Sequence, residues 1–425
     1  MRAVSLCATA AQDPLDQNSF LEKDSNMREF VHPAINALRD AGPELKAQAA
    51  VNTEERRLSD ATAKILRDTG AMRLVQPARY GGLEADPRVF VEAMMLASQF
   101  DGAAGWVLGV VGVHNWHIGL YADEVQKEVW GDDHDTWVSS SYNYVGKASR
   151  VQGGFRLTGR WSFSSGCEHA RWVFVGGFVF DDEGRPLEMR HFLLPRQDYE
   201  IVDVWHVAGL CGSGSNDIVV DGAFVPDARS MSWPDLKAHN CPGTEVNRSA
   251  LFRVPWGSMF LNAVTAPLVG MARGMLDESV ALVKQRVSGY VPPGPSTGPF
   301  DAKRIWPAVT MARLAEASAE VDAARVQMLD NLGDVYSYAE TGEEVPLDVR
   351  ARARRDQVMA AKRATDAANS IFSLAGGRGL SLKSPIQRLW RDAQAGAHHV
   401  VNGADQALTS YGAFLIGEEI EDQLV

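Results

Sequence analysis

The pattern of apolar and polar positions changes character twice along the chain, and its first part is helical. Up to about residue 135, apolar side chains recur at the spacing of an amphipathic helix. Residues 88–119 are apolar and rich in small side chains, which predicts a buried helical hairpin. Residues 1–27 show no clear periodicity, and we expect them to be flexible. The first part therefore predicts an N-terminal helical domain over residues 28–135.

The second part, residues 136–233, consists of short β-rich runs broken by Gly, Asp and Pro. This texture predicts a compact antiparallel unit of about six to eight strands. The third part, residues 245–425, is helical again and contains four long amphipathic segments, the last running from Pro385 to Gly412. Four long helices after a sheet predict a four-helix bundle.

Composition narrows the class of protein. The chain has 425 residues, 45% of them hydrophobic, with a formal net charge of -12 and a pI of about 5.4. This acidic balance argues against a nucleic-acid-binding protein, which needs a concentrated basic patch. A basic run between Arg350 and Arg363 is interleaved with Ala and Asp at helical spacing, so we interpret it as a solvated helix face.

The four cysteines, Cys7, Cys167, Cys211 and Cys241, are far apart and form no CxxC pair. Neither a zinc site nor a disulfide framework is indicated, and reduced thiols fit a cytoplasmic protein. We find no run of about 18 apolar residues and therefore expect no membrane partner. The mildly apolar stretch after Arg2 is too short for a signal peptide.

Two serines, Ser164 and Ser165, follow a strand-like run and precede Gly166. Hydroxyl and backbone N–H groups at a strand end can bind the polar edge of a flat ring system such as a reduced flavin. Taken alone, such a turn is more often structural. Nearby glycines at 209, 212 and 214 precede a strand-like segment and no helix, which excludes a dinucleotide-binding fingerprint but leaves a pocket-lining loop open.

Among the histidines, His114 shares a helix face with Trp106, because the two residues are eight positions apart. A single histidine on an apolar helix is more often a core residue than a ligand. His398 and His399 form a pair that we place on the last long helix, where neighbours point about 100° apart. The sequence contains no HExxH spacing and no nucleophile elbow, so neither a metalloenzyme nor a hydrolase is indicated.

Several segments in one order resemble a known family over residues 28–417: "YGGLEADP", "RWSFSSGCEHARWVF", "GSGSNDIVVDGAFVP", "GMARGML" and "RLWRDAQAGAHH". They are similar to the flavin-dependent monooxygenases of the acyl-CoA dehydrogenase superfamily, such as the oxygenase components of p-hydroxyphenylacetate 3-hydroxylase and the secosteroid phenol hydroxylase. The resemblance implies a mainly α acyl-CoA dehydrogenase-like fold with a central β-barrel domain between an N-terminal helical domain and a C-terminal four-helix bundle. It also implies a homotetramer.

The resemblance further implies the chemistry. Reduced flavin, FMNH2 or alternatively FADH2, would come from a separate NAD(P)H:flavin reductase and react with O2 to give a C4a-hydroperoxyflavin. That species would hydroxylate a small aromatic substrate ortho to a phenol hydroxyl. The absence of a dinucleotide-binding fingerprint agrees with an external reductase. Phenols ionise near pH 10, so a neighbouring histidine is needed to share the proton near neutral pH.

The resemblance also assigns roles to individual residues. It implies catalytic roles for His114, which contacts the phenol, for Ser165 near flavin N5, and for His399, which stabilises the hydroperoxide. Trp106 and Ser140 would contact the substrate. The residues implied in flavin binding are Phe163, Ser164, Ser165, Arg286, Gly376, Gly377 and His398. At position 394 relatives often carry a histidine, whereas this chain has Gln394, which puts the particular substrate in doubt.

Two alternatives stay open. An acyl-CoA dehydrogenase needs a carboxylate base, and alignment on "RDA" puts Val400 where many members carry that glutamate. A non-catalytic flavin-binding protein would need no proton-handling groups, whereas His114 and His399 provide two.

Overall fold

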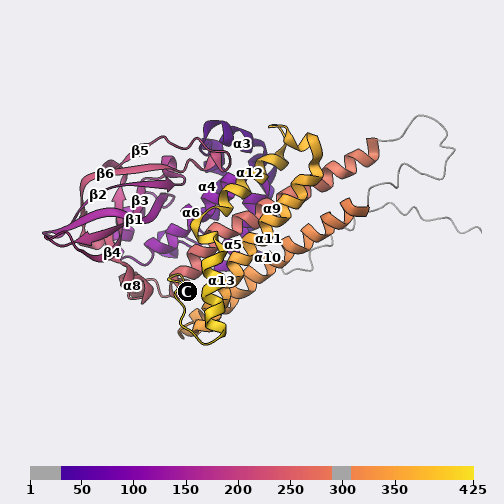
Figure 1. Cartoon of the computed structure of the whole chain (residues 1–425). Helices are drawn as coiled ribbons and strands as arrows, with labels where there is room; N and C mark the ends of the chain where they lie inside the picture. The colour runs from indigo at the N-terminus through magenta and orange to yellow at the C-terminus, as the bar shows by residue number, and fades with distance from the viewer. Residues whose placement is uncertain (1–29, 290–307) are drawn as a thin grey trace, which may run out of the picture. The chain divides into compact units, whose positions relative to one another are not determined.

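The computed structural model describes residues 30–289 and 308–425, with the side chains of 285–289 and 308 excepted. The expected flexible segment 1–27 lies outside the described residues. Residues His32–Val425 form one compact unit, to which everything below refers. Figure 1 shows its strands on one side and its long helices on the other.

The first helices are α2 (Pro33–Asp40), α3 (Gly42–Glu55), α4 (Asp60–Asp68), α5 (Pro87–Phe100), α6 (Gly102–Ile118) and α7 (Asp123–Trp130). The expected hairpin consists of α5 and α6, which pack against each other and are joined by Asp101 alone. The Asp101 carboxylate accepts a hydrogen bond from the Ala103 N–H and so caps α6. Nearly every residue of α6 is buried, because the helix contacts both β1 and α9.

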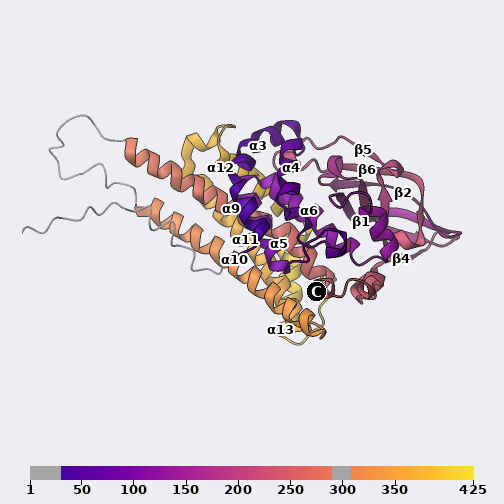
Figure 2. The same ribbon diagram turned by 180° about the vertical axis from the view of Figure 1, so that it is seen from behind.

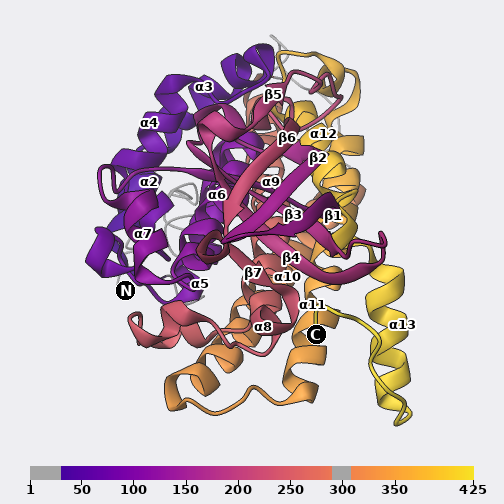
Figure 3. The same cartoon turned by 90° about the vertical axis from the view of Figure 1, so that its left-hand side faces the viewer.

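The sheet contains β1 (Val138–Val151), β2 (Gly154–Ser164), β3 (Trp172–Phe180), β4 (Pro186–Pro195), β5 (Glu200–Val202), β6 (Asn216–Pro226) and β7 (Ser230–Ser232). Their order is β5-β6-β2-β1-β3-β4-β7. The pairs are antiparallel except β1 with β3, which are parallel, so the sheet is mixed. One face carries a core of buried side chains that includes Phe155, Trp161 and Phe192. Figure 3 views the unit from the sheet side.

The expectation of a closed β-barrel was wrong, and so was that of a purely antiparallel unit. Within the described residues the sheet ends at β5 and β7, which do not pair with each other. Both edge strands are only three residues long, since β5 leads into a long loop and β7 runs directly into α8 (Trp233–Lys237). Such short edges offer too few backbone groups to close the sheet.

The C-terminal helices are α9 (Trp256–Gly289), α10 (Ala308–Thr341), α11 (Leu347–Ala375), α12 (Pro385–Ala397) and α13 (Ala404–Leu415). Helix α9 is central, since it contacts α5, α6, α10, α11 and α12, and Figure 2 shows α9, α10 and α11 running side by side. Among the described helices, α9 alone is long and apolar enough to cross a membrane, but 89% of that apolar stretch is buried inside the unit. Its hydrophobicity is therefore that of a core helix.

The last predicted helix, from Pro385 to Gly412, is in fact interrupted. Helix α12 ends at Ala397, a short 3-10 turn η11 (Val400–Asn402) follows, and α13 begins at Ala404. His398 is the C-cap of α12, whereas His399 is the N-cap of η11, with an extended backbone. The two histidines therefore do not lie on a continuous helix, and this break gives the His399 ring its direction.

Candidate functional site

Helix α6 connects the predicted site residues. The Trp106 indole N–H donates a hydrogen bond to Ser165 Oγ at 3.2 Å, and its ring meets the His399 ring edge-on at 5.9 Å between centroids. Two turns further along the same face lies His114. The structure thus brings together three segments that are far apart in the sequence.

His114 is 1% exposed, and its Nδ1 lies 2.5 Å from the carbonyl oxygen of Val138. Because a carbonyl only accepts, Nδ1 carries the proton and donates it to Val138. Burial lowers the pKa of His114 to about 4, so the ring is neutral at ordinary pH. Its second nitrogen, Nε2, is therefore a proton acceptor.

Aromatic side chains surround the His114 ring. Tyr142, Phe174 and Phe260 have their centroids 5.8, 5.8 and 6.0 Å away. Ser140 on β1 is in register with Phe174 on β3, and paired residues point to the same side of a sheet. Ser140 therefore lies on the face of the sheet that carries Phe174 and meets His114, and its contact with a substrate stays a prediction.

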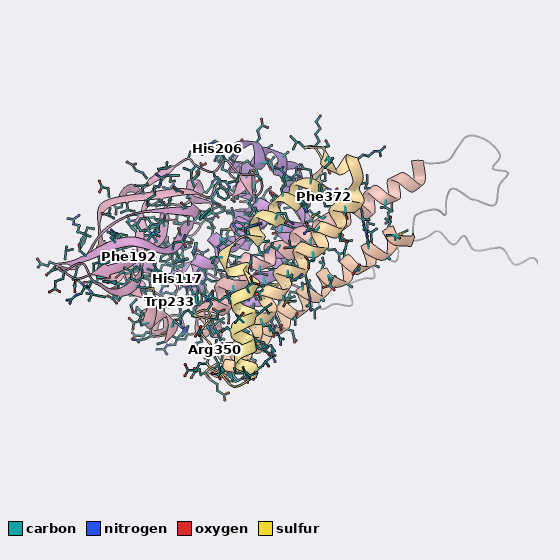
Figure 4. All side chains as sticks on the ribbon, in the orientation of Figure 1. His117, Phe192, His206, Trp233, Arg350 and Phe372 are labelled. Carbon is teal, nitrogen blue, oxygen red and sulfur yellow. The ribbon has the colours of Figure 1, made fainter. Side chains whose placement is uncertain are left out.

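Beyond His114 lies a second buried group, which the sequence did not predict. His117 Nδ1 is 2.7 Å from the Tyr142 hydroxyl, and His191 Nε2 is 2.9 Å from the Tyr144 hydroxyl. Burial lowers the pKa of both histidines, that of His191 to about 3. The His191 ring has its centroid 5.5 Å from that of His117 and 5.8 Å from that of Trp233, and Figure 4 labels the last two residues. Neutral imidazoles and phenols make this end of the site apolar but able to form hydrogen bonds.

Phe163 and Ser164 are the last two residues of β2, and Ser165 begins the turn that follows. Phe163 has a left-handed backbone, with φ of 72°, and its side chain is 63% exposed. A bulky residue in this conformation is strained, which is common at ligand-binding positions. Ser164 is fully buried, and its hydroxyl has no hydrogen-bond partner among the described residues. An exposed ring beside a buried hydroxyl without a partner fits a flat, polar-edged cofactor such as flavin.

His399, in ring contact with Trp106, provides a hydrogen-bond donor. Its Nδ1 accepts a hydrogen bond of 3.3 Å from the Val401 N–H, so in the neutral ring Nε2 carries the proton. Burial of the ring lowers the pKa of His399 to about 4, which keeps it neutral. Since Nδ1 faces η11, the Nε2–H points away from that turn.

A buried polar network holds the His399 turn. The Asn402 N–H donates to the His399 carbonyl at 2.8 Å, and its side chain donates to the carbonyls of Val264 and Gly396. Thr265 on α9 donates its hydroxyl proton to Asn402 Oδ1 at 2.7 Å. These bonds fix the backbone from which the His399 ring projects.

The same network continues through Gln357 and Arg354 to Asp422. Gln357 donates to both Thr265 and Asn402, and it accepts from Arg354. Arg354 also donates to the Val401 carbonyl at 2.8 Å and to Asp422 at 2.8 Å. Arg354 is 5% exposed, so the prediction that this basic run is solvated throughout was wrong at this position. The reason is the buried Asp422 carboxylate, which lies 68 residues away in sequence.

Three predicted flavin-binding residues, Gly376, Gly377 and His398, make no hydrogen bond or ring contact in the described chain with Trp106, Ser165 or His399. Gly376 and Gly377 follow α11 with open space around both, and Gly376, at φ 61° and ψ −159°, has a backbone that suits glycine. His398 is exposed, and its Nδ1–H donates to the Gln394 carbonyl at 2.8 Å. For Arg286, on α9, the side chain lies outside the described residues.

Sequence reasoning missed the serine hydroxyls of the 211–215 loop. Ser215 Oγ is 2.7 Å from Ser165 Oγ, and Ser213 Oγ is 2.7 Å from Ser215 Oγ. The only sequence signal was a Gly/Ser loop before a strand. Within the described chain no group of three or more His, Cys, Asp or Glu residues could hold a metal ion.

Comparison with known proteins gives consistent matches. The family profile "Acyl-CoA dehydrogenase, C-terminal domain" matches residues 263–403. The chain is 41% identical over 392 residues to the flavin-dependent monooxygenase oxygenase subunit HsaA of Mycobacterium tuberculosis, covering 92% of this chain and 97% of that protein. It is 32% identical to the FADH(2)-dependent resorcinol hydroxylase oxygenase component of a Rhizobium species, over 89% and 92% of the two chains. The solved structure of 3-HSA hydroxylase from Rhodococcus sp. RHA1 matches with a TM-score of 0.87 at 39% identity, over 93% and 99%.

Proposed function

Since this chain belongs to the flavin-dependent monooxygenase oxygenase subunits of the acyl-CoA dehydrogenase fold, we propose that it hydroxylates a phenol at the carbon ortho to its hydroxyl. The observation that supports this most is which nitrogen of the His114 ring donates a hydrogen bond and which one can accept. Its neutral ring donates through Nδ1 to Val138 and leaves Nε2 as an acceptor. A buried acceptor of this kind suits a phenol hydroxyl.

When bound, reduced flavin supplies the electrons with which O2 is activated for transfer of one oxygen atom. Ser165 and the exposed Phe163 are the residues proposed to hold its ring, together with Ser164, whose buried hydroxyl lacks a partner. We propose FMNH2 as the flavin, with FADH2 as the alternative. The resorcinol hydroxylase relative is named as FADH(2)-dependent.

His114 orients the phenol and takes or shares its proton. A phenolate donates electrons to its ortho carbon more strongly than a phenol does, but phenols ordinarily ionise at a pKa of about 10. A neutral imidazole within hydrogen-bond distance lowers the cost of that ionisation. Ser140 lies on the face of the sheet that meets His114, and we propose that its hydroxyl forms a second hydrogen bond with the substrate hydroxyl.

His399 acts as a hydrogen-bond donor. Its Nε2–H is available because Nδ1 is engaged with Val401. When one oxygen atom of O2 is transferred to the electron-rich ortho carbon, negative charge develops on the oxygen atom that is left behind. A fixed donor in a water-poor site would stabilise that charge. The buried Trp106 ring packs edge-on against the His399 ring and helps to exclude water from that side of the imidazole.

Several parts of the proposal concern the assembled protein. Because the relatives are named as oxygenase subunits or components, a separate reductase supplies the reduced flavin; we propose an NAD(P)H:flavin reductase. We also propose a homotetramer in the cytoplasm, in keeping with the free thiols of Cys167, Cys211 and Cys241. The division into units 28–135, 136–233 and 245–425 is supported by the change from helix to strand and back.

The test is product analysis with chemically reduced FMN or FADH2, O2 and a panel of phenols. The proposal expects a catechol and incorporation of one oxygen atom from 18O2. Reduction of tightly bound oxidised FAD by an acyl-CoA, without catechol, would instead indicate a dehydrogenase. At the position where many dehydrogenases carry their base, this chain has the 81% exposed, apolar Val400, which favours the monooxygenase.

A further inference from the structure

A row of three buried serine hydroxyls leads from the loop before β6 to Ser165. The Ser213 hydroxyl donates to the Leu210 carbonyl at 2.8 Å. Ser213 and Ser215 are 2.7 Å apart at Oγ, and Ser215 and Ser165 are also 2.7 Å apart. The three residues are 1%, 3% and 8% exposed, so water does not compete for these bonds.

Counting protons fixes the direction of every bond in this row. A hydroxyl has one proton to donate, and a carbonyl oxygen has none. Ser213 gives its proton to Leu210, so in its contact with Ser215 it accepts, and Ser215 is the donor. Ser215 has then used its proton, so Ser165 must donate to Ser215.

Ser165 is thereby left without a proton for a ligand. Its oxygen already accepts from the Trp106 indole N–H at 3.2 Å. What remains at Ser165 Oγ is one lone pair, which makes the residue an acceptor toward anything bound at this face.

The beginning of the row is rigidly held. Leu210 has a left-handed backbone, with φ of 53°, and its N–H donates to the buried Asp392 carboxylate at 2.6 Å. Its carbonyl also accepts from the Trp205 indole N–H at 2.9 Å. Reversing the row would place a Ser213 lone pair against that carbonyl and lose one buried hydrogen bond.

We propose that Ser213 and Ser215 set the redox-state preference of the flavin site by holding Ser165 as an acceptor. The N5 of reduced flavin carries a hydrogen and can donate to Ser165, whereas the N5 of oxidised flavin only accepts and meets a lone pair. This inference rests on the proposed function, since it requires flavin at Ser165. Ser213 and Ser215 are positioning residues, because they act through Ser165.

The test is anaerobic equilibrium titration of the full chain with FMN and FAD, each in the oxidised and the reduced state. In Ser215→Ala, the Ser165 proton loses its acceptor and is free to turn toward N5 of oxidised flavin. We expect oxidised flavin to bind more tightly, and the ratio of the oxidised to the reduced Kd to fall about tenfold, the usual weight of one buried hydrogen bond. Ser213→Ala should change the ratio in the same direction.

Two variants serve as controls. Ser215→Thr keeps the hydroxyl and should keep the wild-type ratio. Ser230→Ala removes a buried hydroxyl on β7, near the other edge of the sheet, where it donates to the Asp227 carbonyl. It should leave both affinities unchanged.

A second measurement is the midpoint potential of the bound flavin. Because the ratio of the two affinities sets that potential, a tenfold fall in the ratio should lower it by about 30 mV for a two-electron couple. A variant that only damages the fold weakens both redox states together and leaves the potential unchanged.

The outcomes separate the two proposals. If wild type favours reduced flavin but Ser215→Ala and Ser213→Ala keep its ratio, or lose affinity equally for both states, the serine row does not set the preference and the proposed function stands. If wild type binds neither flavin in either state, the proposed function fails and this inference fails with it.

Discussion

His114, two turns from Trp106 on α6, and His399, in ring contact with Trp106, are both buried histidines, but their hydrogen-bonding roles are opposite. Burial lowers the pKa of each to about 4, so both are neutral. His114 donates through Nδ1 to a carbonyl, whereas His399 accepts through Nδ1 from an N–H. The first therefore presents an acceptor at Nε2 and the second a donor. The comparison teaches that the backbone partner of Nδ1, and not the pKa, decides which imidazole can accept a proton at Nε2 and which can donate one.

The largest effect on the hydroxylation rate is expected from substitution of His114, the proposed proton acceptor. His114→Asn keeps an N–H that can donate to Val138 but removes Nε2, so the hydroxylation rate should fall about 100- to 10,000-fold, the usual contribution of a general base. Affinity for reduced flavin should remain, and O2 consumption should continue with release of H2O2. Product formed per O2 consumed is the measurement. Lost flavin affinity would contradict the assignment of His114 to the substrate end.

The next largest effect is expected from substitution of His399, the proposed hydrogen-bond donor. His399→Asn preserves a side-chain oxygen that can cap η11 by accepting from Val401, but it removes the Nε2–H. We expect the coupled rate to fall roughly 100- to 1000-fold, since one fixed donor contributes about 3–4 kcal/mol. His398→Asn, at the exposed neighbouring position, is the matched control and should be close to wild type. Full coupling in His399→Asn together with loss in His398→Asn would reverse the choice of histidine.

The lowered pKa of these buried histidines can be tested through the pH dependence of the unfolding free energy. Below the ordinary pKa of 6.5 the unfolded chain protonates His114, while the folded chain does so only near pH 4. Stability should thus be lost as pH falls from 6.5 to 4, by about 3 kcal/mol for this buried group. Urea unfolding across this range should show a smaller loss in His114→Asn. Equal slopes in both proteins would mean that His114 is not held neutral.

Asp392 changes the unfolding free energy with pH in the opposite direction, so its contribution must be separated from that of His114. Burial raises the pKa of Asp392 from 3.8 to about 7, so its contribution to stability is lost as pH rises through that range. The difference between wild type and His114→Asn cancels this term, because Asp392 is present in both.

The smallest effect concerns the network behind His399. Thr265→Val keeps the shape but removes the hydroxyl that joins Gln357 to Asn402. We expect a loss of about 1–3 kcal/mol in unfolding free energy and a partial loss of coupling, with phenol affinity unchanged. Urea unfolding and product per O2 provide the two readouts. Weaker phenol binding with normal coupling would show that the network supports the other histidine.

The sequence predicted the parts of this site that depend on local spacing. Eight positions on one helix place Trp106 and His114 on one face, and the Ser-Ser-Gly turn after a strand places Ser165. The polarity of each histidine could not be predicted, because it depends on Val138 and on the break in the last helix before Val401. The burial of Arg354 and the open edges of the sheet likewise depend on distant partners, Asp422 in the first case and the absence of β5–β7 pairing in the second.

The contact of Trp106 with both Ser165 and His399 has a consequence for folding order. Trp106 and Ser165 are 59 residues apart, whereas Trp106 and His399 are separated by most of the chain. The more distant contact forms later, because the longer loop must close first. During synthesis, α6 and the sheet are complete long before η11 has been made. The two ends of the site therefore mature at different times, and the His399 end exists only once α9, α11 and Asn402 have packed together. A chain interrupted before residue 399 can carry the acceptor half of the site but never the donor half.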